Sequence, residues 1–197
     1  MPSSEQLLAR LEREAATDGI PIVARPVAVL IHVLTRLVRP ELIVELGTAT
    51  GYSGIWLLRA WPAAHLLTFE VDASRAASAR RNFEEAGVGK RAEVRVENAI
   101  EGLERIPTGV AGVVFNDVLN GLRTLERVER CFWLALNVLK PGGLLLADNT
   151  LGDGEVARRE TRQARRVHRW NNLVHGERSL TGMILPIGDG LSISVRS

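Results

Sequence analysis

The chain has 197 residues, 46% of them hydrophobic and 24% charged, and its formal net charge is +2. This length suits one domain with one substantial core, and the composition excludes a disordered chain, while the balanced charge favours neither nucleic-acid nor membrane partners. The longest apolar run, 27–34, is too short to span a membrane. The single cysteine, Cys131, excludes an internal disulfide and a cysteine-based zinc site. We therefore expect a cytoplasmic protein.

The first 39 residues predict two helices. Apolar side chains recur at helical spacing over 4–17, and Gly19 and Pro21 end that pattern. A second helix is expected from about Pro26 to Arg39. We therefore expect residues 1–39 to form an N-terminal helical cap on a core of residues 40–197, all within a single domain, 1–197.

Short apolar runs then alternate with helical patterns. Strands are predicted over 42–46, 66–70, 92–96, 112–116 and 144–148, and helices over 53–60, 73–86, 99–105 and 121–139. This alternation indicates βαβ units, hence an α/β fold with a doubly wound parallel sheet covered on both faces. The runs 183–187 and 191–195 flank Gly188-Asp189-Gly190, which predicts an antiparallel C-terminal hairpin and a mostly parallel seven-stranded sheet.

A glycine-rich segment, VELGTATGYSG at 44–54, follows the first predicted strand. In an open α/β sheet, a strand, glycine turn and helix form a ligand-binding crevice. The glycines are spaced GxxxGxxG, unlike the GxGxxG turn that approaches a pyrophosphate. Glu45 precedes the turn and would repel phosphate, but it suits the sulfonium and amino acid end of S-adenosylmethionine (SAM).

Two further positions along the sheet edge suit the same ligand. Glu70 closes the second strand, where a carboxylate can accept both ribose hydroxyls, and its spacing from Gly47 fits a βαβ unit. Asn98 follows the third strand and either hydrogen-bonds the adenine edge, with Ala99 leaving room for the ring, or caps the next helix. The combination predicts SAM binding; the alternative is a tight turn without a ligand.

Oxygen-bearing side chains follow the fourth and fifth strands. Asp117 comes directly after the fourth strand, and Asp148 and Asn149 come directly after the fifth. These positions share the carboxyl edge of the sheet, and three oxygen ligands suit a hard cation such as Mg²⁺. The alternative is that Asp148 and Asn149 only shape a turn.

The segment 155–170 is rich in arginine. The arginines on or near one helical face are Arg158, Arg162, Arg165, Arg166 and Arg169. They form either a solvated helix face or a lid that attracts an anionic substrate to the predicted metal ligands Asp148 and Asn149.

These motifs together resemble the cation-dependent O-methyltransferases, the group of catechol and caffeoyl-CoA O-methyltransferases, over about residues 20–197. The resemblance is carried by VELGTATGYSG, by FEVD at 69–72, by KPGGLLLADNTLGDGEV at 140–156 and by the ending LPIGDGLSISVRS. It implies a Rossmann-like class I methyltransferase fold and SAM-dependent methyl transfer to a hydroxyl of a small, catechol-like acceptor chelated to Mg²⁺ or another divalent cation. Relatives in this group are often dimers, so a homodimer is one expectation.

The resemblance also implies a role for each matching position. Val23 and Thr48 would contact the methionine end of SAM. The other positions implied at the cofactor are Glu45, Gly47, Ser53, Glu70, Asn98, Ala99 and Asp117. The metal ligands would be Asp117, Asp148 and Asn149.

One position departs from the family pattern. Relatives carry a lysine, the general base, three residues after the first metal aspartate, and here FNDVLN places Asn120 at that position. The resemblance makes Asp117 and Asn120 the candidate catalytic residues. An amide cannot accept the proton in that way. Either metal activation of an acidic phenol suffices, or the substrate is not a catechol and another residue is the base. Two further alternatives are methylation of another nucleophile without metal and a non-catalytic SAM-binding module. The candidates for another base, by residue type alone, are His32, His168 and His175.

Overall fold

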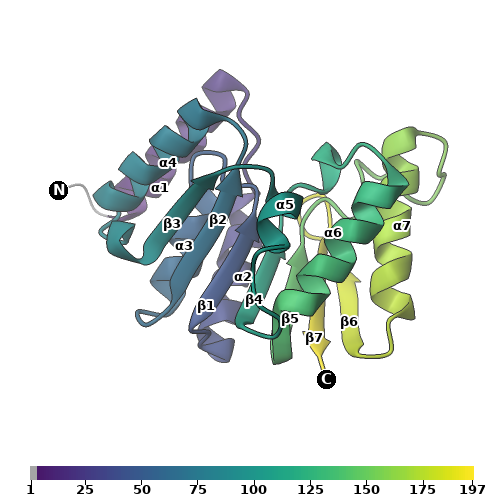
Figure 1. The fold of residues 1–197 in the computed structure, drawn as a ribbon. Coiled ribbons are helices and arrows are strands. Elements are labelled where there is room, and N and C mark those ends of the chain that lie inside the picture. Colours follow the sequence, from purple (N-terminus) through teal and green to yellow (C-terminus); the bar gives the residue numbers. More distant parts are fainter. Residues whose placement is uncertain (1–3) are drawn as a thin grey trace.

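The structure, a computed structural model, describes residues 4–197 and contains one seven-stranded sheet (Figure 1). The strands are β1 (Leu42–Leu46), β2 (His65–Glu70), β3 (Ala92–Val96), β4 (Ala111–Asn116), β5 (Leu139–Ala147), β6 (Leu180–Leu185) and β7 (Leu191–Arg196). Their order is β3-β2-β1-β4-β5-β7-β6, and only β7 runs antiparallel to its neighbours β5 and β6. The predicted α/β fold, with a mostly parallel sheet and an antiparallel C-terminal hairpin, is confirmed.

Helices cover both faces of this sheet. They are α1 (Ser4–Asp18), α2 (Arg25–Val38), α3 (Tyr52–Ala60), α4 (Ala73–Glu85), α5 (Ala99–Leu103), α6 (Leu125–Val138) and α7 (Arg162–Gly176), with short 3-10 helices η1 (Gly89–Arg91) and η2 (Leu119–Gly121). Buried side chains of α1 to α4 pack on one face, and those of α5 to α7 pack on the other. None of the helices in residues 4–197 combines the length and apolar character needed to cross a membrane.

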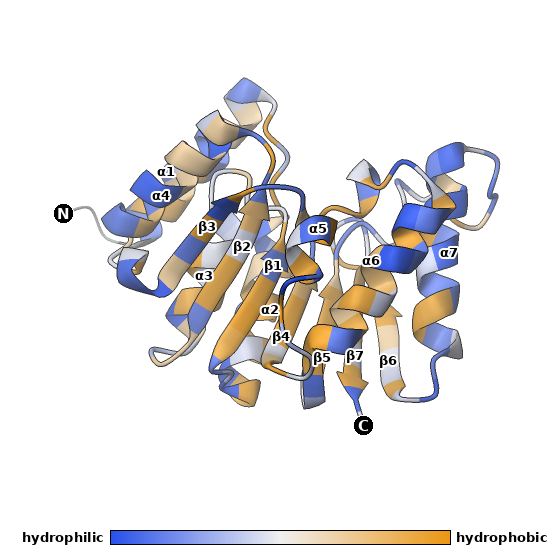
Figure 2. Cartoon of the chain, in the orientation of Figure 1, coloured by the Kyte–Doolittle hydropathy of each residue, from blue (hydrophilic) through white to orange (hydrophobic). Residues whose placement is uncertain are grey.

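Successive residues of the central strands enter opposite layers of the core. In β1, for example, Ile43 packs with the α1–α4 layer and Val44 with the α5–α7 layer. The inner strands are consequently apolar along most of their length, as Figure 2 shows, whereas much of α4 and α7 is polar. Because both faces are buried, the carboxyl edge of the sheet is where polar side chains can gather.

Several elements begin or end away from their predicted limits. Strand β5 starts at Leu139, because Leu139 pairs with Ala111 before an irregular stretch, and regular pairing resumes at Leu144 with Val113. Pro141 and the two glycines after it read as a turn in the sequence, so the strand was predicted to start only at residue 144. The hairpin strand β6 lies at Leu180–Leu185 instead of 183–187, so its turn is longer than predicted.

The region around residue 120 also differs from the prediction. Helix α6 begins at Leu125 because the side chain of Thr124 accepts a hydrogen bond from the Arg127 amide at 3.2 Å, which caps the helix. Residues 119–121 form the separate helix η2.

The arginine-rich segment is not one continuous helix. Thr161 caps α7 by accepting a hydrogen bond from the Ala164 amide at 3.0 Å, and residues 152–158 form turns. Arg158 therefore lies on a loop, while Arg162 and Arg165 are exposed on the first turns of α7. Arg169 pairs with Glu129 of α6 at 2.8 Å, so it serves helix packing.

Candidate active site

The glycine turn after β1 is built against the end of β4. Gly47 has a φ of +96°, and a side chain there would meet Val118 Cγ1 at 2.9 Å and the Asp117 carbonyl oxygen at 3.1 Å. The amides of Gly47 and Thr48 both donate to the carbonyl of Phe69 at 3.1 Å. The turn is thus held between β2 and β4, and only glycine fits at position 47 without strain.

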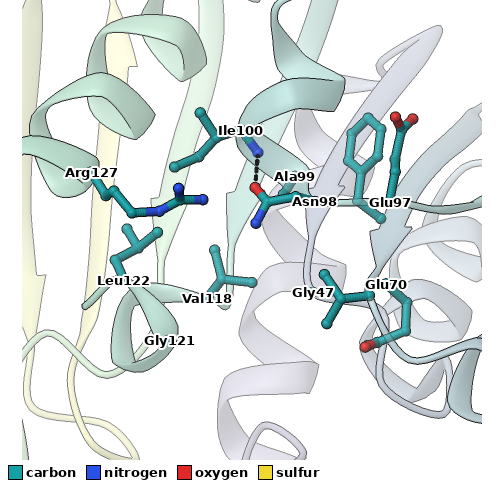
Figure 3. Close-up of a pocket in the computed structure, with 12 residues that line it drawn as sticks. Gly47, Glu70, Glu97, Asn98, Ala99, Ile100, Val118, Gly121, Leu122 and Arg127 are labelled. Atoms are coloured by element: carbon teal, nitrogen blue, oxygen red, sulfur yellow. Dashed lines mark hydrogen bonds between the residues drawn. The ribbon is translucent and has the colours of Figure 1, made fainter. Parts of the chain in front are cut away.

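Beside this turn lies a cavity of about 180 Å³ at the carboxyl edge of the sheet (Figure 3). It brings together four of the predicted cofactor residues: Gly47, Glu70, Asn98 and Ala99. The lining residues that sequence reasoning missed include Glu97, Val118, Leu122 and Arg127. Val118 and Leu122 flank η2 and Arg127 lies in the first turn of α6, elements whose boundaries the sequence did not reveal.

Glu70 is held rigidly at one end of the cavity. Its two carboxylate oxygens accept hydrogen bonds from the amides of Ala49 at 2.9 Å and Asp72 at 3.0 Å. These bonds tie the end of β2 to the glycine turn. They leave further acceptor capacity on both oxygens, since each carboxylate oxygen can accept more than one hydrogen bond.

Asn98 caps α5 and also lines the cavity. Its Oδ1 accepts a hydrogen bond from the Ile100 amide at 3.0 Å and so caps α5. The same residue, with the buried Ala99, lines the cavity (Figure 3).

Glu45 lies behind the glycine turn and does not line the cavity. It is fully buried, and its oxygens accept hydrogen bonds from Ser53 Oγ at 2.6 Å and Thr68 Oγ1 at 2.7 Å. Thr48 joins the same network through a 2.6 Å contact between its hydroxyl and that of Thr68. Burial raises the pKa of Glu45 to about 7. Val23 is also buried, within the apolar layer of α1 to α4.

The residues predicted to bind a metal lie at the ends of the adjacent strands β4 and β5. The amide of Asp117 donates to Leu46 at the end of β1 at 2.9 Å, and the amide of Asp148 donates to Asn116 at the end of β4 at 3.0 Å. Asp148 is buried, and its Oδ1 has no hydrogen-bond partner within residues 4–197. Asn149 adopts a φ of +62°, which asparagine tolerates better than most residues.

The electrostatics of this edge reflect crowded, buried carboxyl groups. Burial, with the neighbouring charges of Asp148 and Glu45, raises the pKa of Asp117 well above its usual range. Burial, with a smaller contribution from the nearby charge of Asp189, raises the pKa of Asp148 to about 6. Within residues 4–197, no three histidine, cysteine or acidic side chains are arranged as a metal site.

Asp189 is a residue of this edge that sequence reasoning missed. It lies in the hairpin turn, and its Oδ1 accepts a hydrogen bond from the Asp153 amide at 2.8 Å. The turn was visible in the sequence, but its place beside the β5 end depends on β7 pairing with β5.

Asn120, the residue at the family lysine position, is exposed and faces α7. Its Oδ1 accepts a hydrogen bond from Gln163 Nε2 at 3.1 Å. Two of the three histidines named as candidate bases have other contacts: His32 Nδ1 lies 2.9 Å from the Trp56 carbonyl between α2 and α3, and His168 Nε2 lies 3.0 Å from Asn172 on α7.

Comparisons with known sequences agree with this architecture. The family model described as O-methyltransferase matches residues 3–197. A putative O-methyltransferase of Mycobacterium sp. (strain JLS) is 30% identical over 201 residues, which cover 98% of this chain and 88% of that protein. The catechol O-methyltransferase of Niastella koreensis is 35% identical over 127 residues, and this match spans 64% of the present chain and 57% of that relative's length.

Solved structures show the same likeness. A putative O-methyltransferase from Klebsiella pneumoniae matches with a TM-score of 0.84 at 29% identity, covering 97% of this chain and 90% of that one. An O-methyltransferase from Streptomyces achromogenes involved in tomaymycin synthesis, solved in complex with SAM, matches with a TM-score of 0.82 at 28% identity, covering 97% of this chain and 89% of that one. Since the family model spans all but the first two residues and the fold matches these enzymes throughout, this chain belongs to the O-methyltransferase family.

Proposed function

We propose that this enzyme uses SAM as methyl donor and transfers the methyl group to a hydroxyl of a small acceptor. The observation that carries the proposal is the cavity at the carboxyl edge, where Gly47, Glu70 and Ala99 meet beside the glycine turn. A cavity at this place in a doubly wound sheet is where such folds bind nucleotide-like ligands. The Streptomyces relative, solved with SAM, supports the same donor.

The cofactor residues divide into two groups in this proposal. Glu70 accepts the ribose hydroxyls, while Asn98 and Ala99 lie at the adenine. The residues at or behind the glycine turn, which serve the methionine end, are Val23, Glu45, Gly47, Thr48, Ser53 and Asp117. Because Glu45 is fully buried, we assign it an indirect role: it holds Ser53 and, through Thr68, Thr48 in place.

The residues at the β4 and β5 ends fit a divalent cation. Asp148 has a buried oxygen without a partner within residues 4–197, and Asp117 carries a carboxyl group close to other acids. Buried like charges are costly unless a cation or protons compensate them. We propose that Asp117, Asp148 and Asn149 hold Mg²⁺ or a similar ion, which when bound supplies a Lewis acid that lowers the pKa of a coordinated hydroxyl.

The acceptor should have an acidic hydroxyl, such as that of a catechol or another phenol. Asn120 cannot accept a proton, and its bond to Gln163 holds it against α7, so the chain places no general base at that position. The enzyme then contributes mainly by positioning the ionised oxygen for in-line displacement. The exposed Arg158, Arg162 and Arg165 follow the metal edge in sequence and favour an acceptor that also carries negative charge.

Methyl transfer to a panel of catechols and simple phenols tests this proposal. We expect activity with a vicinal diphenol, loss of it in EDTA and loss of it in Asp148→Ala. Asp18→Ala, at an exposed position on α1, is the matched control and should retain activity. Full activity in EDTA would contradict the metal-dependent mechanism but leave SAM-dependent methylation standing.

Asn120 also favours a second candidate, methylation of another nucleophile such as an amine without metal. Mass spectrometry of the product distinguishes O-methylation from N-methylation. Turnover with any acceptor would exclude a third possibility, a non-catalytic SAM-binding module.

We further propose that residues 1–197 act as one methyltransferase domain, with 1–39 as a helical cap on the core 40–197. Ion pairing of Arg10 with Glu85 of α4 at 2.6 Å supports a cap fixed to the core. A cytoplasmic homodimer completes the proposal. Light scattering of the purified protein should give twice the mass of one chain.

A further inference from the structure

An arginine lies at the end of the cavity opposite Glu70. Arg127 projects from the first turn of α6 toward Asn98, while Glu70 and Gly47 lie on the far side (Figure 3). If Glu70 meets the ribose, as proposed above, this opposite end is where the adenine base must lie. The family resemblance assigned no role to Arg127.

The position of Arg127 is not explained by stability. A cation in the first turn of a helix lies at the positive end of the helix dipole, which is unfavourable. Its ion pair with Glu101 is loose, at 3.8 Å, and both side chains are more than a third exposed. Exposed pairs of this kind contribute little.

A second donor is available at the same end. The Oδ1 of Asn98 is occupied by the Ile100 amide, so its Nδ2 is turned away from α5 into the space beside Val118 (Figure 3). The acidic Glu97 of the cavity wall is paired with Arg105. The side chains of this end therefore offer N–H donors, and guanidinium and amide N–H groups can only donate.

We propose that Arg127 is a positioning residue for the cofactor base: its guanidinium, together with the Asn98 amide, donates hydrogen bonds to acceptor nitrogens of the adenine ring. The inference rests on the proposed use of SAM. Adenine offers ring nitrogens as acceptors, whereas its exocyclic amine is a donor that an arginine cannot bond. Arg127 thus selects how the base is turned in the cavity and, through the base, how the cofactor lies.

Calorimetric titration with S-adenosylhomocysteine tests this role. We compare the wild type with Arg127→Met and with Arg130→Met, a matched control one helical turn further along α6 that pairs with Glu104 outside the cavity. Loss of a charge-assisted hydrogen bond should weaken binding roughly tenfold or more in Arg127→Met. Arg130→Met should bind as the wild type does.

Cofactor analogues separate direct contact from a general disturbance of the cavity. We titrate 1-deaza, 3-deaza and 7-deaza forms of S-adenosylhomocysteine, each lacking one ring acceptor. In the wild type, at least one analogue should bind more weakly than the parent. In Arg127→Met the penalty should disappear for the nitrogen that Arg127 contacts, because that nitrogen no longer has its donor, while a penalty at a nitrogen bonded by Asn98 should remain.

The outcomes are distinct. Equal affinity of Arg127→Met and wild type for S-adenosylhomocysteine, or deaza penalties that persist unchanged in Arg127→Met, would overturn the role of Arg127 alone. Absence of S-adenosylhomocysteine binding to the wild type would instead overturn the proposed cofactor, and this inference with it.

Discussion

The carboxyl group of Glu45 is unusual among the acids of this chain because it is fully buried and is satisfied by hydroxyl groups alone. Neither Ser53 nor Thr68 carries a charge that would compensate a carboxylate. Burial therefore dominates, and the pKa of Glu45 rises to about 7 from a usual value of 4.5. Near neutral pH, small changes in pH should alter the charge behind the glycine turn.

This gives a prediction for the pH dependence of stability. The folded state binds the Glu45 proton more tightly than the unfolded state, so stability from this group falls as pH rises from about 4.5 to about 7. Glu45→Gln, which cannot ionise, should lose less stability over that range, by an amount on the order of 3 kcal/mol. Thermal unfolding at a series of pH values in EDTA measures the difference. Glu84→Gln, on the exposed side of α4, should follow the wild type; parallel curves for Glu45→Gln and wild type would contradict the prediction.

Gly47 gives a second prediction for a single residue. In Gly47→Ala, the new methyl group would lie 2.9 Å from Val118 Cγ1 at a φ of +96°. We expect a loss of about 2 kcal/mol in unfolding free energy, with weaker S-adenosylhomocysteine binding because the turn must move. Urea unfolding measures the first effect and calorimetry the second.

Gly87→Ala is the matched control for that substitution. Gly87 also has a positive φ, +71°, but a methyl group there would meet nothing within 4 Å. It should lose some stability through backbone strain and keep its affinity for S-adenosylhomocysteine. If both variants lost affinity equally, the close approach at Gly47 would not be the cause.

Helix α1 is tied to the glycine turn at the scale of whole elements. Glu12 of α1 accepts a hydrogen bond from the hydroxyl of the buried Tyr52, the first residue of α3, and another from Arg25 Nε at 2.8 Å. One carboxylate thus connects α1, the start of α2 and the helix that follows the turn. A displacement of α1 should therefore alter the position of α3 and weaken cofactor binding at the glycine turn.

Glu12→Ala should therefore destabilise the fold by about 1–3 kcal/mol, because it leaves a buried hydroxyl without its acceptor. It should also weaken S-adenosylhomocysteine binding. Glu14→Ala, two residues along the same helix, removes only a surface pair with Arg10 and should cost less than about 1 kcal/mol. Chemical denaturation measures the free energy of unfolding of the two variants. Similar decreases in both would show that the Glu12–Tyr52 hydrogen bond contributes no more to stability than the surface pair does.

The elements also show what a sequence can and cannot reveal. Short apolar runs predicted a strand near each of the seven observed positions, and the inner strands gave the clearest signal because they are buried on both faces. The limits of α6 and α7 were missed because each depends on one capping threonine, Thr124 and Thr161. Strand β5 was predicted too short because Pro141 is a strong turn signal, which pairing of Leu139 with Ala111 overrides.

At the scale of the whole molecule, the site combines residues that are predictable with residues that are not. Asp117, Asp148 and Asn149 could be placed at one edge because the carboxyl ends of parallel strands lie together. Arg127 and Asp189 could not, because their positions depend on how α6 and the hairpin pack against the sheet. The sequence pattern thus indicates which polar residues lie at each strand end, whereas tertiary packing determines which other residues line the cavity.

The order of the strands has a consequence for how the protein is made. Strand β7 follows every other strand in the sequence, yet it lies inside the sheet between β5 and β6. During synthesis, β5 is therefore left with an open edge until residues 191–196 have emerged. The turn before β7 also holds the segment after β5: the Thr150 amide donates to the Gly190 carbonyl at 3.0 Å, and the Leu151 amide donates to the Asp189 carbonyl at 2.8 Å. A ribosome that stalls before β7 would release a chain with an unpaired apolar strand and an incomplete active site, a species more prone to aggregation than to partial activity.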